Sequence, residues 1–201
     1  VQGYPEACNA AAGKIKIIYG IEDYFIDDIK EPDKTYKELR SYHQIILVKN
    51  HIGLKNLYKL ISKSNIDYFY KKPRMPKSEI IKHREGLIIG SACEAGELYR
   101  AILEERPEQE IMEIASFYDY LEIQPVGNNR FMIDAHSDPS AKNPDKNKEF
   151  DKITCIEDIE NINRKVIAIA DKLGKPVVAT CDVHFIDPED AKYRAILMAA
   201  Q

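Results

Sequence analysis

The sequence lacks the features that mark membrane, secreted and strongly basic proteins. Its apolar runs are all shorter than the length needed to cross a membrane, and its first residues do not form a signal peptide. Its formal net charge is -4, so the chain has no basic excess of the kind that supports a large, sequence-independent nucleic-acid surface. These absences predict a cytoplasmic protein without a membrane partner.

Cysteine is also scarce. The four cysteines have no CxxC spacing and are too few for a disulfide-stabilised scaffold, which favours a reduced compartment. The chain begins with Val1 rather than methionine and enters helical sequence at once, so we expect a fragment of a longer protein.

The sequence alternates between strand-like and helix-like segments. At 201 residues it fits one domain, with 44% hydrophobic and 31% charged residues. The hydrophobic periodicity predicts helices over 6–12, 54–61, 97–105, 108–117 and 154–173, and strands over 15–22, 24–26, 43–48, 87–90, 120–124 and from 176. Such alternation predicts an α/β fold with a parallel sheet, either open or closed into a barrel. Residues 126–150 are rich in Gly, Asn, Pro and charge, and are expected to form a loop or insertion.

The segment 176–185 carries the clearest local signal. An apolar, β-branched run predicts a buried strand, and Asp182 and His184 follow it two residues apart. This spacing places both side chains on one side of an extended backbone. The pair fits metal ligands or an acid/base couple. An alternative fits the pattern equally well: Asp182 caps the next helix, and His184 makes an ordinary hydrogen bond.

Three further residues with metal-ligating chemistry lie near the ends of predicted strands. Glu22 closes the first strand, His43 begins the third, and Cys93 follows the strand over 87–90. A barrel would bring these residues together with Asp182 and His184. Zinc, manganese or iron accepts this mixture of imidazole, carboxylate and thiolate ligands.

Several separated motifs carry a family resemblance. They read YHQIILVKN at 42–50, GLKNLYKLIS at 53–62, FYKKPRMP at 69–76, EGLIIGSACEAGEL at 85–98, FYDYLEIQP at 117–125 and ATCDVHF at 179–185. In this order they resemble the PHP (polymerase and histidinol phosphatase) domain of bacterial DNA polymerase III alpha subunits of the PolC type. The resemblance covers nearly all of residues 1–201 and is weakest over 126–150.

The resemblance implies a distorted (β/α)7 barrel of the PHP type with up to three divalent metal ions, incomplete at its N-terminus. Glu22 matches a glutamate that bridges two metals, and His43 and Cys93 match ligands of the second metal. Asp182 matches a ligand of the first metal and His184 a ligand of the third. Two further ligand motifs, a His-x-His and a Thr-Asp-His, would precede Val1.

Two functions follow from the resemblance. In the first, the chain is part of a replicative DNA polymerase, and its metal-binding domain supports the polymerase core. DNA, other polymerase domains, the sliding clamp and replisome proteins would then be partners of the parent protein. In the second, the chain belongs to a metal-dependent phosphoesterase or a proofreading 3'-5' exonuclease. We assign no catalytic residue to the fragment, and we expect it to be inactive alone because ligand motifs are missing.

The basic run over 70–74 is a separate candidate. Lys72 and Arg74 are expected either to contact DNA or another polymerase domain, or to lie in a plain solvated loop.

Overall fold

The computed structural model describes residues 3–134 and 150–199. The predicted loop over 126–150 begins with two short helices, η1 (Val126–Asn129) and α6 (Phe131–Asp134). Most of the rest of that predicted loop lies outside the described residues.

The larger sheet has five strands in the order β3-β4-β1-β2-β5. These are β3 (Phe69–Tyr70), β4 (Lys72–Pro76), β1 (Gly20–Ile26), β2 (Ser41–Val48) and β5 (Leu87–Gly90). β4 is parallel to β1, but β2 is antiparallel to both β1 and β5. The predicted parallel sheet is therefore wrong here. The connection over 27–40 contains turns but no crossover helix, so β2 returns beside β1 in the opposite direction.

A second sheet pairs β6 (Leu121–Ile123) in parallel with β7 (Val177–Ala179). The crossover between them includes α8 (Ile156–Leu173), so the predicted strand–helix–strand order is confirmed at this place. A single bridge from Gly90 to Tyr120 links the two sheets. A Cβ atom at Gly90 would lie 2.3 Å from the Tyr120 ring, so a larger residue there would have to displace that ring.

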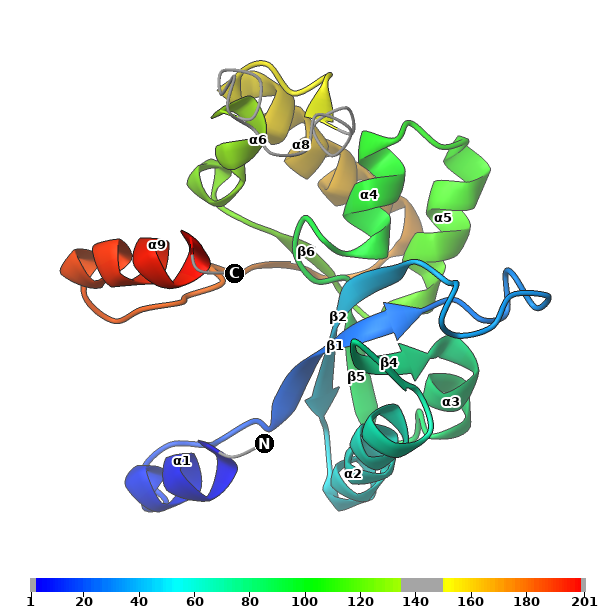
Figure 1. Cartoon of the computed structure of the whole chain (residues 1–201), viewed down its shortest axis with the longest axis vertical. Helices are drawn as coiled ribbons and strands as arrows, with labels where there is room; N and C mark the ends of the chain where they lie inside the picture. Colours follow the sequence, from blue (N-terminus) through cyan, green and yellow to red (C-terminus); the bar gives the residue numbers. More distant parts are fainter. Residues whose placement is uncertain (1–2, 135–149, 200–201) are drawn as a thin grey trace.

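The fold is mixed α/β, as predicted, but the described strands do not close into a barrel. Among them, β3 and β7 form the outer edges, and neither pairs with the other. The helices α2 (His51–Ile66) and α3 (Lys77–Lys82) lie beside one end of the larger sheet, and α4 (Glu97–Leu103), α5 (Glu108–Phe117) and α8 gather at the other (Figure 1). One continuous apolar core joins these layers, from Phe25 and Ile46 in the sheet to Ile159 and Val166 on α8.

The first strand differs from its prediction. The two segments expected over 15–22 and 24–26 form one strand, β1, which starts only at Gly20. Ile15 and Ile18 are 68% and 60% exposed. The apolar run before Gly20 therefore packs against no core in the described structure, and Glu22 lies inside the strand rather than at its end.

Two helices stand away from the rest of the molecule. Figure 1 shows α1 (Gly3–Ala11) and α9 (Ala191–Ala199) projecting on the same side. No residue of α9 is buried, and Val178 in β7 is 40% exposed. The expectation of a buried strand at this position is thus wrong about burial, although the strand itself forms.

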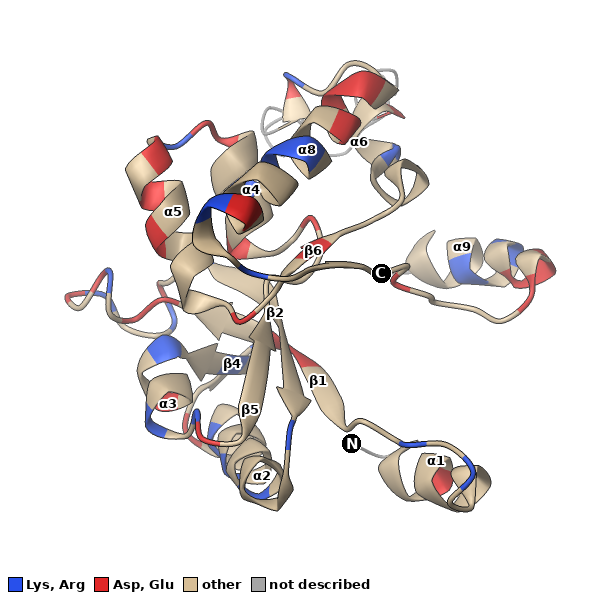
Figure 2. Ribbon diagram, turned by 180° about the vertical axis from the view of Figure 1, so that it is seen from behind, with Lys and Arg blue, Asp and Glu red and all other residues tan. Residues whose placement is uncertain are grey.

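Charged residues lie mainly on the helices and connecting loops (Figure 2). Among the strands, β1 holds the acidic Glu22 and Asp23, β4 the basic Lys72 and Arg74, and β6 the acidic Glu122. None of the described helices combines the length and apolar character that a membrane span requires.

Candidate metal centre

Glu22 and His43 are brought together by the register of β1 and β2. Glu22 is paired with Ile45, and His43 with Tyr24, so the two residues are diagonal neighbours on an antiparallel pair. Such neighbours project from the same face of the sheet, within reach of long side chains. The His43 Nδ1 atom lies 2.7 Å from Glu22 Oε1.

Cys93 comes from the turn between β5 and α4, which we call the Cys93 turn (residues 91–96). Its backbone is anchored to β2, because the His43 amide donates to the Ala95 carbonyl at 2.9 Å. Ala92 adopts a left-handed conformation with φ of 59°, which is rare for a residue with a side chain. A Cβ at Gly96 would lie 2.2 Å from the Ser91 carbonyl oxygen, so the turn is too tight there for any other residue. This turn points the Cys93 side chain at His43.

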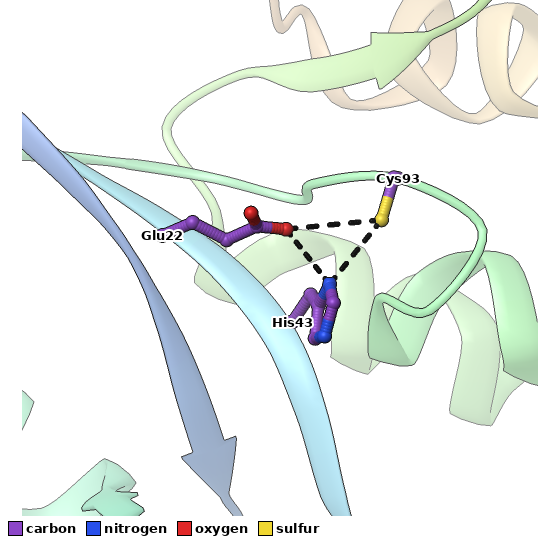
Figure 3. Close-up of side chains that lie close together, drawn as sticks. All are labelled: Glu22, His43 and Cys93. Atoms are coloured by element: carbon purple, nitrogen blue, oxygen red, sulfur yellow. Dashed lines mark hydrogen bonds and ion pairs between the residues drawn. The ribbon is translucent and has the colours of Figure 1, made fainter. Parts of the chain in front are cut away.

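The three side chains converge (Figure 3). The Cys93 Sγ atom lies 3.5 Å from His43 Nδ1 and 3.9 Å from Glu22 Oε1. Among the described residues, Glu22, His43 and Cys93 are the one group of at least three such side chains whose ligand atoms all lie within 4.8 Å of one another.

This geometry fits a divalent metal ion. Ligands around tetrahedral zinc are separated by about 3.4 to 3.6 Å, given the usual metal–ligand distances. The two separations that involve sulfur are already close to this range. Only the hydrogen-bonded His43–Glu22 pair is too short, and a small side-chain movement would open it.

The electrostatics of the group favour a cation. The hydrogen bond from His43 is the largest effect on the pKa of Glu22 and lowers it, against the opposing effect of burial. Burial is also the main reason why the pKa of the Cys93 thiol is strongly raised, and Glu94 and Glu22 raise it further. A bound metal would supply the positive charge that a thiolate here otherwise lacks.

A cavity of about 560 Å³ opens beside this group. Glu22, Cys93, Glu122, Val178 and Asp182 are among the residues that line it. The lining is largely apolar, so its few carboxylates are the charged groups that a ligand would meet.

Asp182 and His184 do not join the three-residue cluster. They follow β7 on an exposed stretch of chain, and Asp182 has a φ of 49°. The His184 ring bonds to the Asp182 carbonyl through Nδ1 at 2.7 Å. Asp182 does not cap the next helix, because η3 (Pro188–Asp190) is capped by Asp187. Asp182 nevertheless lines the same cavity as Glu22 and Cys93, and His184 is near enough to lower the pKa of Glu22.

Arg74 and Lys72 lie in strand β4, so the interpretation as a solvated loop is wrong. Arg74 is 9% exposed, and its guanidinium donates to the carbonyls of Tyr36 and Leu39 at 2.8 and 2.6 Å. It anchors the 27–40 connection, and its inward position does not support a contact with DNA. Lys72 is half-buried, with Nζ 3.9 Å from the centre of the Tyr24 ring.

Glu122 is a residue of the site that the sequence analysis missed. It is 8% exposed and lines the cavity from β6. Its Oε2 accepts a hydrogen bond from the Thr180 hydroxyl at 2.9 Å. Burial raises the pKa of Glu122, and hydrogen bonds from Thr180, Tyr120 and the Ala92 amide oppose this rise. A carboxylate between Leu121 and Ile123 in an otherwise apolar strand was the available signal.

Comparison with known proteins identifies the family of the chain. The PHP domain family matches residues 1–134, a range that contains Glu22, His43 and Cys93 but ends before Asp182. Relatives named DNA polymerase III PolC-type are 48% identical over 186 residues in Clostridium perfringens, 47% over 152 in Caldanaerobacter subterraneus and 42% over 167 in Bacillus subtilis. These alignments cover 90%, 76% and 83% of the chain, but only 12%, 10% and 10% of the relatives. The chain therefore spans about a tenth of these relatives, and by its sequence it belongs to the PHP domain family.

Proposed function

We propose that residues 1–201 form a single PHP domain with a divalent metal centre. Glu22, His43 and Cys93 hold one metal ion, and Asp182 and His184 supply ligands for neighbouring ions. The convergence of the first three side chains within 4.8 Å is the observation that carries the proposal. The mixed ligand set suits zinc, manganese or iron, and up to three ions would be held in an intact centre.

The bound metal would act as a cross-link and as a Lewis acid toward a phosphate oxygen. The residues of this chain hold it between parts of the fold that are distant in sequence. Glu22 and His43 come from paired strands, and Cys93 comes from the turn after β5. A metal at this point ties the Cys93 turn to the sheet.

The parent protein, in this proposal, is a replicative DNA polymerase of the cytoplasm. The support is the identity of 38 to 48% to proteins named DNA polymerase III PolC-type. DNA and replisome proteins, including the sliding clamp, would be partners of that parent. The PHP domain would serve as a metal-stabilised scaffold beside the other polymerase domains, and Lys72 is its remaining candidate for a contact with them.

We further propose that the sheet is part of a distorted (β/α)7 barrel. The free edges of β3 and β7 and the exposed apolar side chains before β1 and after β7 support this. Strands from elsewhere in the parent would then cover the cavity and complete the ligand set.

A second candidate function is phosphoester hydrolysis, either as a phosphoesterase or as a proofreading 3'-5' exonuclease. The open cavity beside the ligand cluster favours it, because a phosphate group could reach a metal held there. No hydrolysis is expected from the 201 residues alone, since too few ligands are present.

Metal analysis combined with a phosphodiesterase assay tests the two functions. Wild-type protein, Asp182→Ala and the exposed control Asp171→Ala would be compared in the parent polymerase. Metal loss and a lower melting temperature in Asp182→Ala, with no hydrolysis in any sample, would support the scaffold. Metal-dependent hydrolysis that is lost in Asp182→Ala but kept in Asp171→Ala would support the enzymatic function and contradict the purely structural one. Equal metal content in all three would contradict the role of Asp182.

A further inference from the structure

One buried residue, Glu122, contacts both parts of the chain that carry the candidate ligands. The Cys93 turn contributes Cys93 to the lining of the cavity, and residues 180–184, which we call the Asp182 limb, contribute Thr180 and Asp182. Glu122 bonds to the turn through its backbone amide and to the limb through its carboxylate. Resting on the metal centre proposed above, we propose that Glu122 is a positioning residue that sets the Cys93 turn and the Asp182 limb relative to each other.

The first connection is to the Cys93 turn. The Glu122 amide donates to the Ser91 hydroxyl at 2.9 Å, and this contact is buried. Ser91 is 3% exposed and lies two residues before Cys93. Between them Ala92 is held in a left-handed conformation, which persists only where surrounding contacts impose it. This backbone contact from Glu122 holds the turn from the side of β6.

The second connection is to the Asp182 limb. The Thr180 hydroxyl donates to Glu122 Oε2 at 2.9 Å, and Thr180 lies two residues before Asp182. The Thr180 amide also donates to the Ile123 carbonyl at 3.1 Å. Because residues after Thr180 are largely exposed, these bonds are the last that tie the limb to β6 before Asp182.

The burial of Glu122 argues against a purely structural role. An apolar side chain at this position would fill the strand interior without the cost of removing a carboxylate from water. The Tyr120 hydroxyl and the Ala92 amide of the Cys93 turn lie close enough to the Glu122 carboxylate to lower its pKa, so the carboxylate also faces that turn. Glu122 shares its cavity with Glu22, Cys93 and Asp182. A role in orienting the ligands of a cation explains why a carboxylate is buried there.

The inference predicts that Glu122 and Thr180 control how the metal is held. Residues that orient metal ligands typically change metal affinity by about 10- to 100-fold when mutated. We expect Glu122→Gln and Thr180→Val to weaken Co²⁺ binding by about 10-fold or more. Thr180→Ser keeps the hydroxyl and should bind like the wild type.

Titration of the 201-residue chain with Co²⁺ tests this directly. The thiolate-to-cobalt absorption band reports ligation by Cys93, and the titration gives the affinity, so no enzymatic activity is needed. Gln124→Leu is the matched control, because Gln124 lines the same cavity and directly follows the strand that holds Glu122. Circular dichroism of each metal-free variant shows whether it folds. If Glu122→Gln does not fold, the comparison of Thr180→Val with Thr180→Ser still tests the inference.

The outcomes separate this inference from the proposed function. If the wild type binds Co²⁺ with a thiolate band and Glu122→Gln and Thr180→Val bind equally well, the positioning role is wrong while the metal centre stands. Equal weakening by Gln124→Leu would also overturn it. If the wild type binds no Co²⁺, or Cys93→Ser leaves the spectrum unchanged, the metal centre itself fails and this inference fails with it.

Discussion

Glu97 is a buried carboxylate outside the candidate metal centre. It is 2% exposed at the start of α4, and burial raises its pKa to about 7. Since an unfolded glutamate titrates near 4.5, the folded state resists ionisation of this group. The resulting loss in the free energy of unfolding is absent below about pH 4.5, grows as the pH rises to about 7, and is constant above that pH.

We therefore expect Glu97→Gln to stabilise the protein at pH 8 by about 2 kcal/mol and to change little at pH 4.5. Urea unfolding at several pH values measures this difference. The exposed Glu113→Gln serves as control and should show no such pH dependence. A Glu97→Gln effect that is the same at both pH values would contradict the expectation.

Arg74 provides a second prediction at this scale. Its two hydrogen bonds to the Tyr36 and Leu39 carbonyls hold the 27–40 connection. Arg74→Met leaves both buried carbonyls without a charged donor, and we expect it to reduce the free energy of unfolding by about 2 to 4 kcal/mol. The neighbouring Lys72→Met should cost about 1 kcal/mol or less, because Lys72 loses mainly its contact with the Tyr24 ring. Similar costs for both would argue against the anchoring role.

Among the elements, α8 shows most clearly how the sequence pattern becomes packing. The apolar stripe of this helix faces the core through Ile159, Ile162 and Val166, and Gly174 ends the helix with a φ of 63°. Ile156 lies on the same stripe but is 49% exposed, since it is the first residue of the helix. The two isoleucines therefore allow a matched comparison.

Ile159→Ala should lower the free energy of unfolding by about 2 to 5 kcal/mol, because Ile159 is fully buried and its truncation leaves a cavity. Ile156→Ala should cost about 1 kcal/mol or less. Thermal and urea unfolding of both variants check this. Equal losses would show that α8 does not pack as described.

On the scale of the whole molecule, the candidate metal centre would cross-link β1, β2 and the Cys93 turn through their side chains. If it binds metal as proposed, chelation should lower the melting temperature. At a free metal concentration 100 times the dissociation constant, binding adds about 2.7 kcal/mol, or about 5 to 10 °C for a chain of this size. Calorimetry with and without chelator measures the shift.

Cys93→Ser is the control for that measurement, and it should greatly reduce the shift. The shift should also grow as the pH rises, because the Cys93 thiol has a raised pKa and must lose its proton to bind metal. A chelator effect of the same size in Cys93→Ser would locate the metal elsewhere.

The sequence predicted individual elements better than their assembly. The helix over 108–117 and the strand over 87–90 were placed at their observed bounds, because their apolar periodicity and flanking Pro107 and Gly90 are local signals. β4 and α3 were missed, since Pro73 and Pro76 interrupt the pattern and the run of basic residues resembles a loop. Local signals could not predict the direction of β2 or whether the sheet closes into a barrel, because both depend on pairing between distant segments.

The sequence by itself determined which residues have ligand chemistry: Glu22, His43, Cys93, Asp182 and His184. Residue type is enough for that, and the order of the motifs indicates the family. The tertiary structure alone decided that the first three meet, through a diagonal register between β1 and β2 and a tight turn after β5. It also showed that Asp182 and His184 lie outside this cluster and that Glu122 lies between the two parts. Distances between residues remote in sequence are set by strand register and turn geometry, which no local pattern encodes.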